Sequence, residues 1–186
     1  MTNDNAAAVH YVCTFDEGKS LLAGQTEFYL RPCGCRTSNS RQPHADNNYC
    51  LWFTAEYQEG WGEPKTITTA DAEQHLERAR REGLVIRPFR DFGNRSDVIG
   101  ICFCCACCCN YFSKSPHEAC DLGAYIEQTE SDLCNDCGHC EPACLFHART
   151  LPDGALQVDH DRCYGCGNCT DVCPTDAIRM VGRIVL

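Results

Sequence analysis

The stretch CNDCGHCEPAC, residues 134–144, returns as CYGCGNCTDVC at residues 163–173. Both copies read C-x2-C-x2-C-x3-C, and each cysteine of the second copy lies 29 positions after its counterpart in the first. A pattern that repeats at a fixed distance indicates an internal duplication. Eight cysteines in this register predict two related metal sites in the C-terminal part of the chain.

The spacing within each copy is chemically specific. A tight loop of this length directs three thiolates towards three irons of one cubane, while the fourth cysteine leaves the loop on a helix. Residues 124–186 closely resemble the bacterial dicluster ferredoxin family, in which that fourth cysteine ligates the other cluster. The resemblance implies one [4Fe–4S] cluster held by Cys134, Cys137, Cys140 and Cys173. It implies a second held by Cys163, Cys166, Cys169 and Cys144.

A pair of zinc sites is the alternative for these residues, but zinc needs only four cysteines in two pairs, and the duplicated register of eight argues against it. One position departs from the family pattern: Pro174 follows the last cysteine of the second copy, whereas Leu145 follows the first. The change removes no ligand. It alters the turn and the shielding around Cys144, and cluster potentials depend on such shielding.

The abundance of cysteine leaves two explanations, disulfides or metals, because 19 of 186 residues are cysteine. The N-terminus has no basic, apolar signal-peptide pattern, and no stretch approaches the roughly 18 apolar residues of a membrane span. We therefore expect a cytoplasmic protein without a membrane span. A reducing compartment keeps thiols free, which favours metal binding, and the odd cysteine count fits a fully paired disulfide framework poorly.

The net charge of −10 is concentrated in the C-terminal half. Residues 1–100 carry −3 and residues 101–186 carry −7. An acidic surface repels phosphate backbones and anionic lipid, which argues against nucleic acid as a partner. It favours a protein redox partner with a basic docking patch, and we expect the chain to serve as a subunit or partner of a larger anaerobic oxidoreductase. Solubility alone is the other explanation of the charge.

A second concentration of cysteine lies upstream. The run ICFCCACCC at residues 101–109 follows RPCGCR at residues 31–36 and a separate cysteine in NNYCLWF. This order is similar to N-terminal domains of other dicluster-ferredoxin proteins of anaerobes, which suggests that the parts form one unit. The candidate metal ligands are Cys33, Cys35, Cys50, Cys102, Cys104, Cys105, Cys107, Cys108 and Cys109.

Strand geometry limits how these thiols can be shared, because successive side chains of a strand point to opposite faces. An extended run places Cys102, Cys104 and Cys108 on one face and Cys105, Cys107 and Cys109 on the other. This predicts one metal site with spare thiols or two adjacent sites. A disulfide between neighbours in the run would be strained and easily reduced.

Four chemistries remain open for this centre. They are a third redox cluster, a closed structural zinc site, a dithiol–disulfide relay supplied with electrons by the ferredoxin part, and other metal handling such as corrinoid chemistry. Cys13 and Cys120 lie outside the run, and we expect them to be buried packing thiols.

The expected fold class is α+β, with a small α/β cysteine-rich domain at residues 1–123 and a ferredoxin-like dicluster domain at residues 124–186. A capping signal at Thr68–Asp71 and a stop at Gly83 predict a helix, and Leu84–Ile86 predicts a buried strand ending before Pro88. This unit could belong to a winged helix. Further expected elements are a helix starting at 115–116 and strands at 125–128, 155–158 and 178–181.

Electron transfer is the function that these patterns favour, with single electrons passing through two [4Fe–4S] clusters to or from the central cysteines and a partner. One alternative is an oxidoreductase whose central site carries a catalytic cluster, and another is a redox-sensing module with structural zinc. The sequence shows no Ser/His/Asp arrangement, phosphate loop or nucleotide motif, so it assigns no catalytic residue. Whether the chain is an enzyme stays open.

Overall fold

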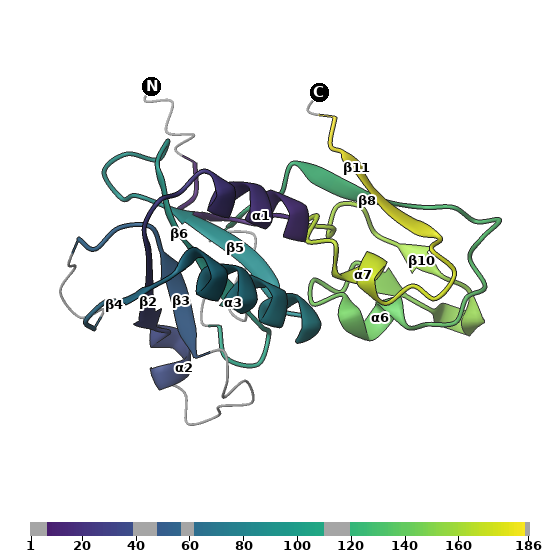
Figure 1. Cartoon of the computed structure of the whole chain (residues 1–186). Helices are drawn as coiled ribbons and strands as arrows, with labels where there is room; N and C mark the ends of the chain where they lie inside the picture. Colours follow the sequence, from purple (N-terminus) through teal and green to yellow (C-terminus); the bar gives the residue numbers. More distant parts are fainter. Residues whose placement is uncertain (1–6, 39–47, 57–61, 110–119, 185–186) are drawn as a thin grey trace, which may run out of the picture.

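The computed structural model describes residues 7–38, 48–56, 62–109 and 120–184. It has a larger N-terminal part built on a sheet and a smaller C-terminal part built on loops and short elements, side by side (Figure 1). The fold is a mixture of helices and sheets, as expected for the α+β class. The expected helix start at 115–116 lies outside the described residues.

The N-terminal sheet has seven strands in the order β4-β2-β3-β6-β5-β1-β7. All neighbours are antiparallel except β1 and β7, which are parallel. The strands are β1 (His10–Tyr11), β2 (Phe28–Pro32), β3 (Tyr49–Trp52), β4 (Lys65–Ile67), β5 (Val85–Arg90), β6 (Val98–Cys104) and β7 (Cys120–Asp121). The helices of this part are α1 (Phe15–Ala23), α2 (Gly34–Ser38) and α3 (Thr69–Arg81). A sheet of this size differs from the winged-helix-like arrangement considered above.

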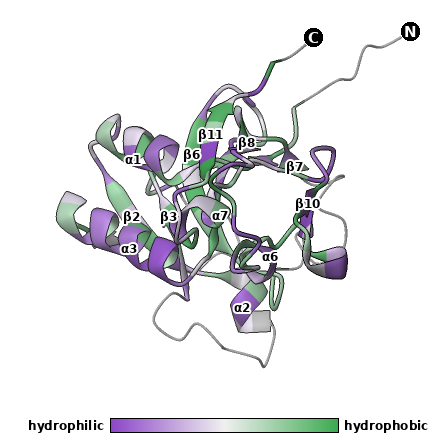
Figure 2. Cartoon of the chain, turned by 90° about the vertical axis from the view of Figure 1, so that its right-hand side faces the viewer, coloured by the Kyte–Doolittle hydropathy of each residue, from purple (hydrophilic) through white to green (hydrophobic). Residues whose placement is uncertain are grey.

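Helices α1 and α3 cover one face of the sheet. Their buried residues Leu22 and Leu76 share a core with strand residues Ile86, Ile101 and Phe103. The outer surface of α3 is largely hydrophilic, as Figure 2 shows, so the helix is stabilised by packing along one stripe. The opposite face of the sheet is therefore left for the cysteine side chains of β3 and β6.

The predicted helix is confirmed. Thr68 is its N-cap, and the hydroxyl of Thr68 accepts from the Asp71 backbone while the Asp71 carboxylate accepts from Thr68, which completes a capping box. Gly83 follows the helix with a φ of +64°, a conformation that suits glycine.

The predicted strand was too short at its end, because β5 continues through Pro88 to Arg90. Backbone groups alternate sides along a strand. The Arg90 amide donates to Val9 on the β1 side, so the Pro88 nitrogen also faces β1 and no bond to β6 is lost. Strand β1 has only two residues, so this short pairing tolerates the missing backbone donor at Pro88.

The described C-terminal part consists of two antiparallel strand pairs, two single-turn α-helices and one short 3-10 helix. Its elements are β8 (Tyr125–Thr129), α6 (Cys140–Ala143), β9 (Arg149–Thr150), the 3-10 helix η2 (Pro152–Gly154), β10 (Gln157–Val158), α7 (Asn168–Asp171) and β11 (Ile178–Gly182). Strand β8 pairs with β11 and β9 pairs with β10, both antiparallel. The strands expected at 125–128 and 178–181 are confirmed, and the one expected at 155–158 is reduced to its last two residues.

Polar contacts join the two parts. Arg80 of α3 donates to both carboxylate oxygens of Asp171, at 3.0 and 2.7 Å, and Asn168 donates to the Gly83 carbonyl at 2.8 Å. The Gly123 amide donates to the Tyr164 carbonyl at 2.9 Å. A Cβ at Gly123 would lie within 2.9 Å of that same carbonyl oxygen, so the close approach requires glycine here.

Candidate metal and redox centre

The ferredoxin-type cysteines sit in irregular loops that lead into α6 and α7. Left-handed glycines allow the turns, with φ of +82° at Gly138 and +81° at Gly165. At Gly165 a Cβ would lie 2.0 Å from the Tyr125 carbonyl oxygen, so the loop packs directly against β8. Helix α6 begins at Cys140, and α7 contains Cys169. Each loop therefore folds back over its own cysteines before its helix begins.

The structure gathers these eight cysteines around two cavities. One cavity is lined by Cys134, Cys137, Cys140 and Cys173. The other is lined by Cys144, Cys163, Cys166 and Cys169. Each set joins three cysteines of one copy to the last cysteine of the other, the arrangement that the resemblance implied.

The spacing of the sulfurs suits a cluster larger than one ion. A tetrahedral ion with metal–sulfur bonds of about 2.3 Å holds its sulfurs about 3.8 Å apart. Among the described residues, the only three Cys, His, Asp or Glu ligand atoms that lie within 4.8 Å of one another belong to Cys105, Cys107 and Cys108. No three of the ferredoxin-type sulfurs lie that close together, so their spacing does not suit a single ion and is compatible with a larger cluster.

Burial around these cavities disfavours free thiolates. It raises the pKa of Cys169 to about 12 against the opposing charge of Arg149, and it raises that of Cys166 further. Coordination deprotonates a thiol outright, so a bound cluster removes this penalty. The Ala148 amide donates to the Cys144 sulfur at 3.3 Å, a hydrogen bond of the kind that tunes cluster potential.

A buried ion pair lies between the two cysteine sets. Arg149 and Glu127 meet at 2.7 Å with side chains 1% and 2% exposed, and His160 approaches the second carboxylate oxygen at 2.6 Å. Burial opposes the charge of Arg149, but Glu127 and the sulfurs of Cys140 and Cys169 raise its pKa. This guanidinium therefore stays charged beside one cysteine of each set. The spacing of the cysteines gave no sign of it.

The central cysteines divide into two groups. The first group lies on the sheet face opposite α1 and α3 and comprises Cys33, Cys35, Cys50, Cys102, Cys104 and Cys109; it is called the sheet-face group below. Within it, the sulfurs of Cys50 and Cys102 are 3.5 Å apart. Cys35 and Cys50 together lower the pKa of Cys33 to about 3.

The second group comprises Cys105, Cys107 and Cys108 and is called the turn group. Strand β6 ends at Cys104, and the Cys109 amide donates to the Cys105 carbonyl at 3.2 Å, which closes a turn. The extended geometry considered for this run holds only as far as Cys104, and a tight turn follows it. The turn moves Cys108 to the side of Cys105 and returns Cys109 to the sheet-face group, so the two exchange their expected faces.

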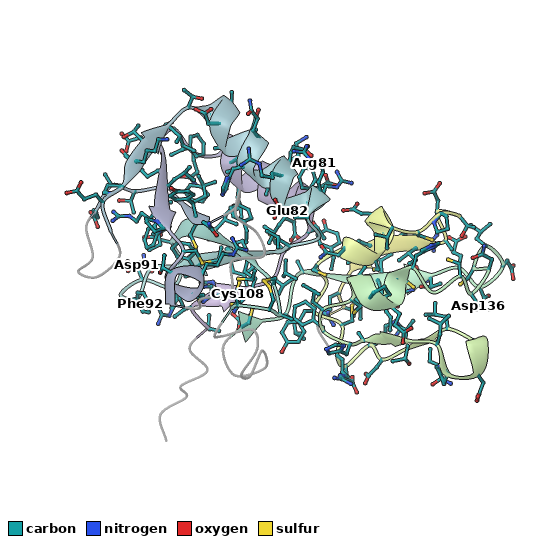
Figure 3. All side chains as sticks on the ribbon, turned by 90° about the horizontal axis from the view of Figure 1, so that it is seen from below. Arg81, Glu82, Asp91, Phe92, Cys108 and Asp136 are labelled. Carbon is teal, nitrogen blue, oxygen red and sulfur yellow. A yellow bond between two sulfur atoms is a disulfide. The ribbon has the colours of Figure 1, made fainter. Side chains whose placement is uncertain are left out.

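A disulfide joins Cys105 and Cys107. Metal binding was the favoured interpretation of these thiols, and a dithiol–disulfide relay was one of the chemistries left open for them. The third member, Cys108, lies with its sulfur 3.1 Å from that of Cys105 and 3.9 Å from that of Cys107. Figure 3 shows Cys108 in the N-terminal part beside the junction with the C-terminal part, among other sulfur atoms.

Each group has a buried arginine that the sequence reasoning missed. Arg87 and Arg36 are both 1% exposed. Arg87 donates to the sulfurs of Cys109 at 3.3 Å and Cys104 at 3.7 Å, while its Nε and second Nη have no hydrogen-bond partner. Buried guanidinium charge without compensation is costly, so sulfur is the counter-charge that this pocket offers. The only sequence signal for a buried arginine beside the cysteines was the position of Arg36 directly after PCGC.

The two thiols expected to be packing residues differ in their surroundings. Cys13 is fully buried in the core between the helices and the sheet. Cys120 of β7 is 6% exposed and lies with Cys104 and Cys109. Burial raises its pKa, and the neighbouring Arg87 opposes that shift. Cys120 thus adds a further thiol to the edge of the sheet-face group.

Aromatic side chains connect the sheet-face group to one of the two C-terminal cavities. The rings of Phe146 and Tyr164 stack with centroids 4.3 Å apart, and both residues pack in one cluster with Cys104, Cys109 and Cys120. Tyr164 also lines the cavity of Cys163 and Cys166. The two cysteine-rich regions therefore meet through packed side chains.

Comparison with known proteins gives one family match. Residues 156–179 match the 4Fe-4S binding domain family, a stretch that includes the second copy of the motif. No curated protein matches the chain. Throughout the residues that the structure describes, no helix is both long and apolar enough to cross a membrane. The chain thus contains a 4Fe-4S binding domain within a cysteine-rich protein, which is consistent with at least one iron–sulfur cluster.

Proposed function

We propose that this protein transfers single electrons through two [4Fe–4S] clusters, to or from a metal site in the sheet-face group and a partner oxidoreductase. One observation carries the proposal: two cavities, each lined by four cysteines in the crossed combination. When bound, each cubane supplies a one-electron couple. The protein holds the cysteines in fixed loops and places the Arg149 charge beside both sets.

The sheet-face group is proposed as the third metal site, holding an iron–sulfur centre; zinc is the alternative from the sequence, but among the described residues no three sulfurs of this group lie within 4.8 Å of one another, which fits a single ion less well. Six thiols exceed the four that one site needs, and Arg87 offsets the negative charge that bound thiolates bring. The stacked pair Phe146 and Tyr164 packs in one cluster with Cys104 and Cys109 and also lines the nearer cavity, so it links the two. The proposed partner is a protein with a basic patch, since the chain carries a net charge of −10.

The crossed ligation can be tested by comparing pairs of serine variants in anaerobically purified protein. If the ligation is crossed, Cys173→Ser and Cys137→Ser alter the same cluster signal in electron paramagnetic resonance. Cys144→Ser and Cys166→Ser then alter the other signal. If Cys144→Ser instead gives the spectrum of Cys137→Ser, each copy binds its own cluster and the proposed arrangement is wrong.

The third site can be tested by metal and sulfide analysis of the same preparations. Two cubanes contribute about eight irons per chain, and any further iron or zinc belongs elsewhere. A triple variant with serine at Cys33, Cys50 and Cys102 should lose only that further metal. Cys13→Ser, a buried thiol outside both groups, is the control and should lose none. A parent protein with eight irons and no other metal would remove the third site from the proposal.

A further inference from the structure

We propose that the turn group is a thiol–disulfide exchange centre that reduces external disulfides, with Cys107 as its exposed sulfur. The class of substrate is an accessible protein disulfide or a small disulfide compound. This activity goes beyond electron transfer through metal clusters, and it assigns a separate role to three cysteines that need not serve as metal ligands.

The geometry of the three sulfurs carries the inference. Exchange requires a thiol in reach of a disulfide sulfur, and Cys108 lies 3.1 Å from Cys105. Cys107 is farther from Cys108, at 3.9 Å, which makes Cys105 the sulfur open to attack from within. Cys105 and Cys108 are 5% and 4% exposed. Cys107 is exposed, so the sulfur that leaves on internal attack is the one that external molecules can reach.

The fold explains why the three sulfurs gather there. Strand β6 ends one residue before Cys105, and the turn directs Cys105 and Cys108 into the core beneath α1 and α3. The sheet-face group stays on the opposite side of the strand. The turn group can therefore exchange disulfides while the other thiols remain free to bind metal.

A buried positive charge serves this group. Arg36 donates to the Phe103 carbonyl at 2.7 Å, but its Nε and first Nη have no hydrogen-bond partner. This guanidinium lies near the sulfur of Cys108 and also near those of Cys33 and Cys104 in the sheet-face group. During exchange one negative charge is shared among three sulfurs. The Arg36 guanidinium is a fixed counter-charge for it.

The internal step needs no reductant. The Cys108 thiolate attacks the Cys105 sulfur, the Cys105–Cys108 bond forms, the Cys105–Cys107 bond breaks, and Cys107 leaves as a thiolate. Net reduction of a substrate requires two electrons and two protons, which convert the Cys105–Cys107 disulfide into two thiols. Either a dithiol or two one-electron donors can supply these electrons. Only supply by one-electron donors, the proposed clusters, rests on the proposed function.

The reduced centre then completes the reaction. The Cys107 thiolate attacks an external disulfide RSSR, forms a mixed disulfide and releases one RS⁻, which takes a proton. Cys105 attacks the Cys107 sulfur, releases the second thiol and restores the Cys105–Cys107 disulfide. The balance is RSSR plus two electrons and two protons giving two RSH.

The disulfide itself can be mapped in full-length protein purified anaerobically with its metals. Thiols are alkylated at acid quench, the remaining disulfides are reduced, and the newly freed thiols receive a second label before peptide mass analysis. We expect the second label on Cys105 and Cys107 in the parent, with a minor fraction on Cys108 from the exchanged form. The inference would be overturned in favour of a metal site if the parent carried no second label and Cys105→Ser lost bound metal.

The role of Cys107 can be trapped with glutathione disulfide after reduction by dithiothreitol and its removal. A variant with serine at both Cys105 and Cys108 should accumulate a stable glutathione adduct on Cys107, whereas the parent should resolve it at least tenfold faster. Cys107→Ser should form no adduct in this segment, and Cys13→Ser should behave as the parent. An unchanged iron content in every variant shows that the clusters are intact. Equal adduct lifetimes in the parent and the double variant would refute the resolving step.

Discussion

Removal of Arg149 tests whether the buried ion pair in the C-terminal part stabilises the fold. The variant Arg149→Met keeps much of the side-chain volume but leaves the Glu127 carboxylate buried without its partner, and the two side chains are 1% and 2% exposed. Breaking a buried pair by removing one partner costs about 3–5 kcal/mol. The matched control is Arg179→Met on β11, whose pair with Glu130 has side chains 56% and 42% exposed. An exposed pair contributes about 1 kcal/mol at most.

The assay is anaerobic urea unfolding followed by far-ultraviolet circular dichroism. With a slope of about 2 kcal/mol per molar urea, Arg149→Met should lower the midpoint by roughly 1.5–2.5 M. Arg179→Met should change it by at most about 0.5 M. The double variant Arg149→Met/Glu127→Gln should recover part of the loss, because it no longer buries a lone charge. If Arg149→Met and Arg179→Met unfold at the same urea concentration, the buried pair does not carry this stability.

The pH dependence gives the sign of the effect. Burial alone raises the pKa of Glu127, but Thr129, Arg149 and His160 outweigh it and lower the pKa. In the parent this stabilisation is present above the unfolded pKa of about 4.3 and is lost as the pH falls through the folded value. In Arg149→Met, protonation of the carboxyl at low pH relieves the buried charge. The midpoints of parent and variant should therefore converge as the pH falls from 7 towards 4, and a constant difference would contradict the charge argument.

Three further substitutions test other parts of the structure. Cys120→Ser should weaken metal retention by the sheet-face group, measured as metal remaining after chelator treatment, whereas Cys13→Ser should match the parent; equal retention in both would return Cys120 to a packing role. Arg87→Leu should lower the same retention and Arg87→Lys should preserve most of it, because the buried charge offsets thiolate; identical loss in both would show that shape alone matters. Gly165→Ala should prevent assembly of the proposed C-terminal clusters, measured as lost iron, because a Cβ there would lie 2.0 Å from a backbone oxygen. The control Gly154→Ala has a similar φ of +79° but nothing within 4 Å of its Cβ, so it should cost only about 1 kcal/mol of stability. Retained iron in Gly165→Ala would refute the packing argument.

The sequence predicted the C-terminal cysteine sets because their geometry is local. A C-x2-C-x2-C loop constrains three sulfurs within seven residues, and the duplication supplies the partner for each remaining cysteine. The helix at Thr69–Arg81 was predictable for the same reason, since its cap and its stop are both written within its own segment. The family match covers only the second copy, so the assignment of the first rests on the repeat and on the cavity that its cysteines line.

The centre was less predictable because its chemistry depends on where one strand ends. Alternation holds along β6 as far as Cys104, and beyond it the turn exchanges the faces of Cys108 and Cys109. The buried arginines were also missed, since nothing in the local sequence says that Arg87 faces sulfur. That placement comes from the register of β5 on β6, where Arg87 lies opposite Cys102.

The end of β6 therefore separates the sheet-face group from the turn group. Cysteines that follow the strand pattern lie on the sheet face beside Arg87, and Phe146 and Tyr164 join them to the nearer C-terminal cavity. Cysteines of the turn lie on the helix side of the sheet, where a disulfide already exists. If all the central thiols bound one metal, a run of cysteines whose side chains all lay on one face of the sheet would be enough to hold it. A strand that stops within the run provides two sulfur environments, with Arg87 beside the sheet-face group and Arg36 near sulfurs of both groups, and the two proposed chemistries need such a separation.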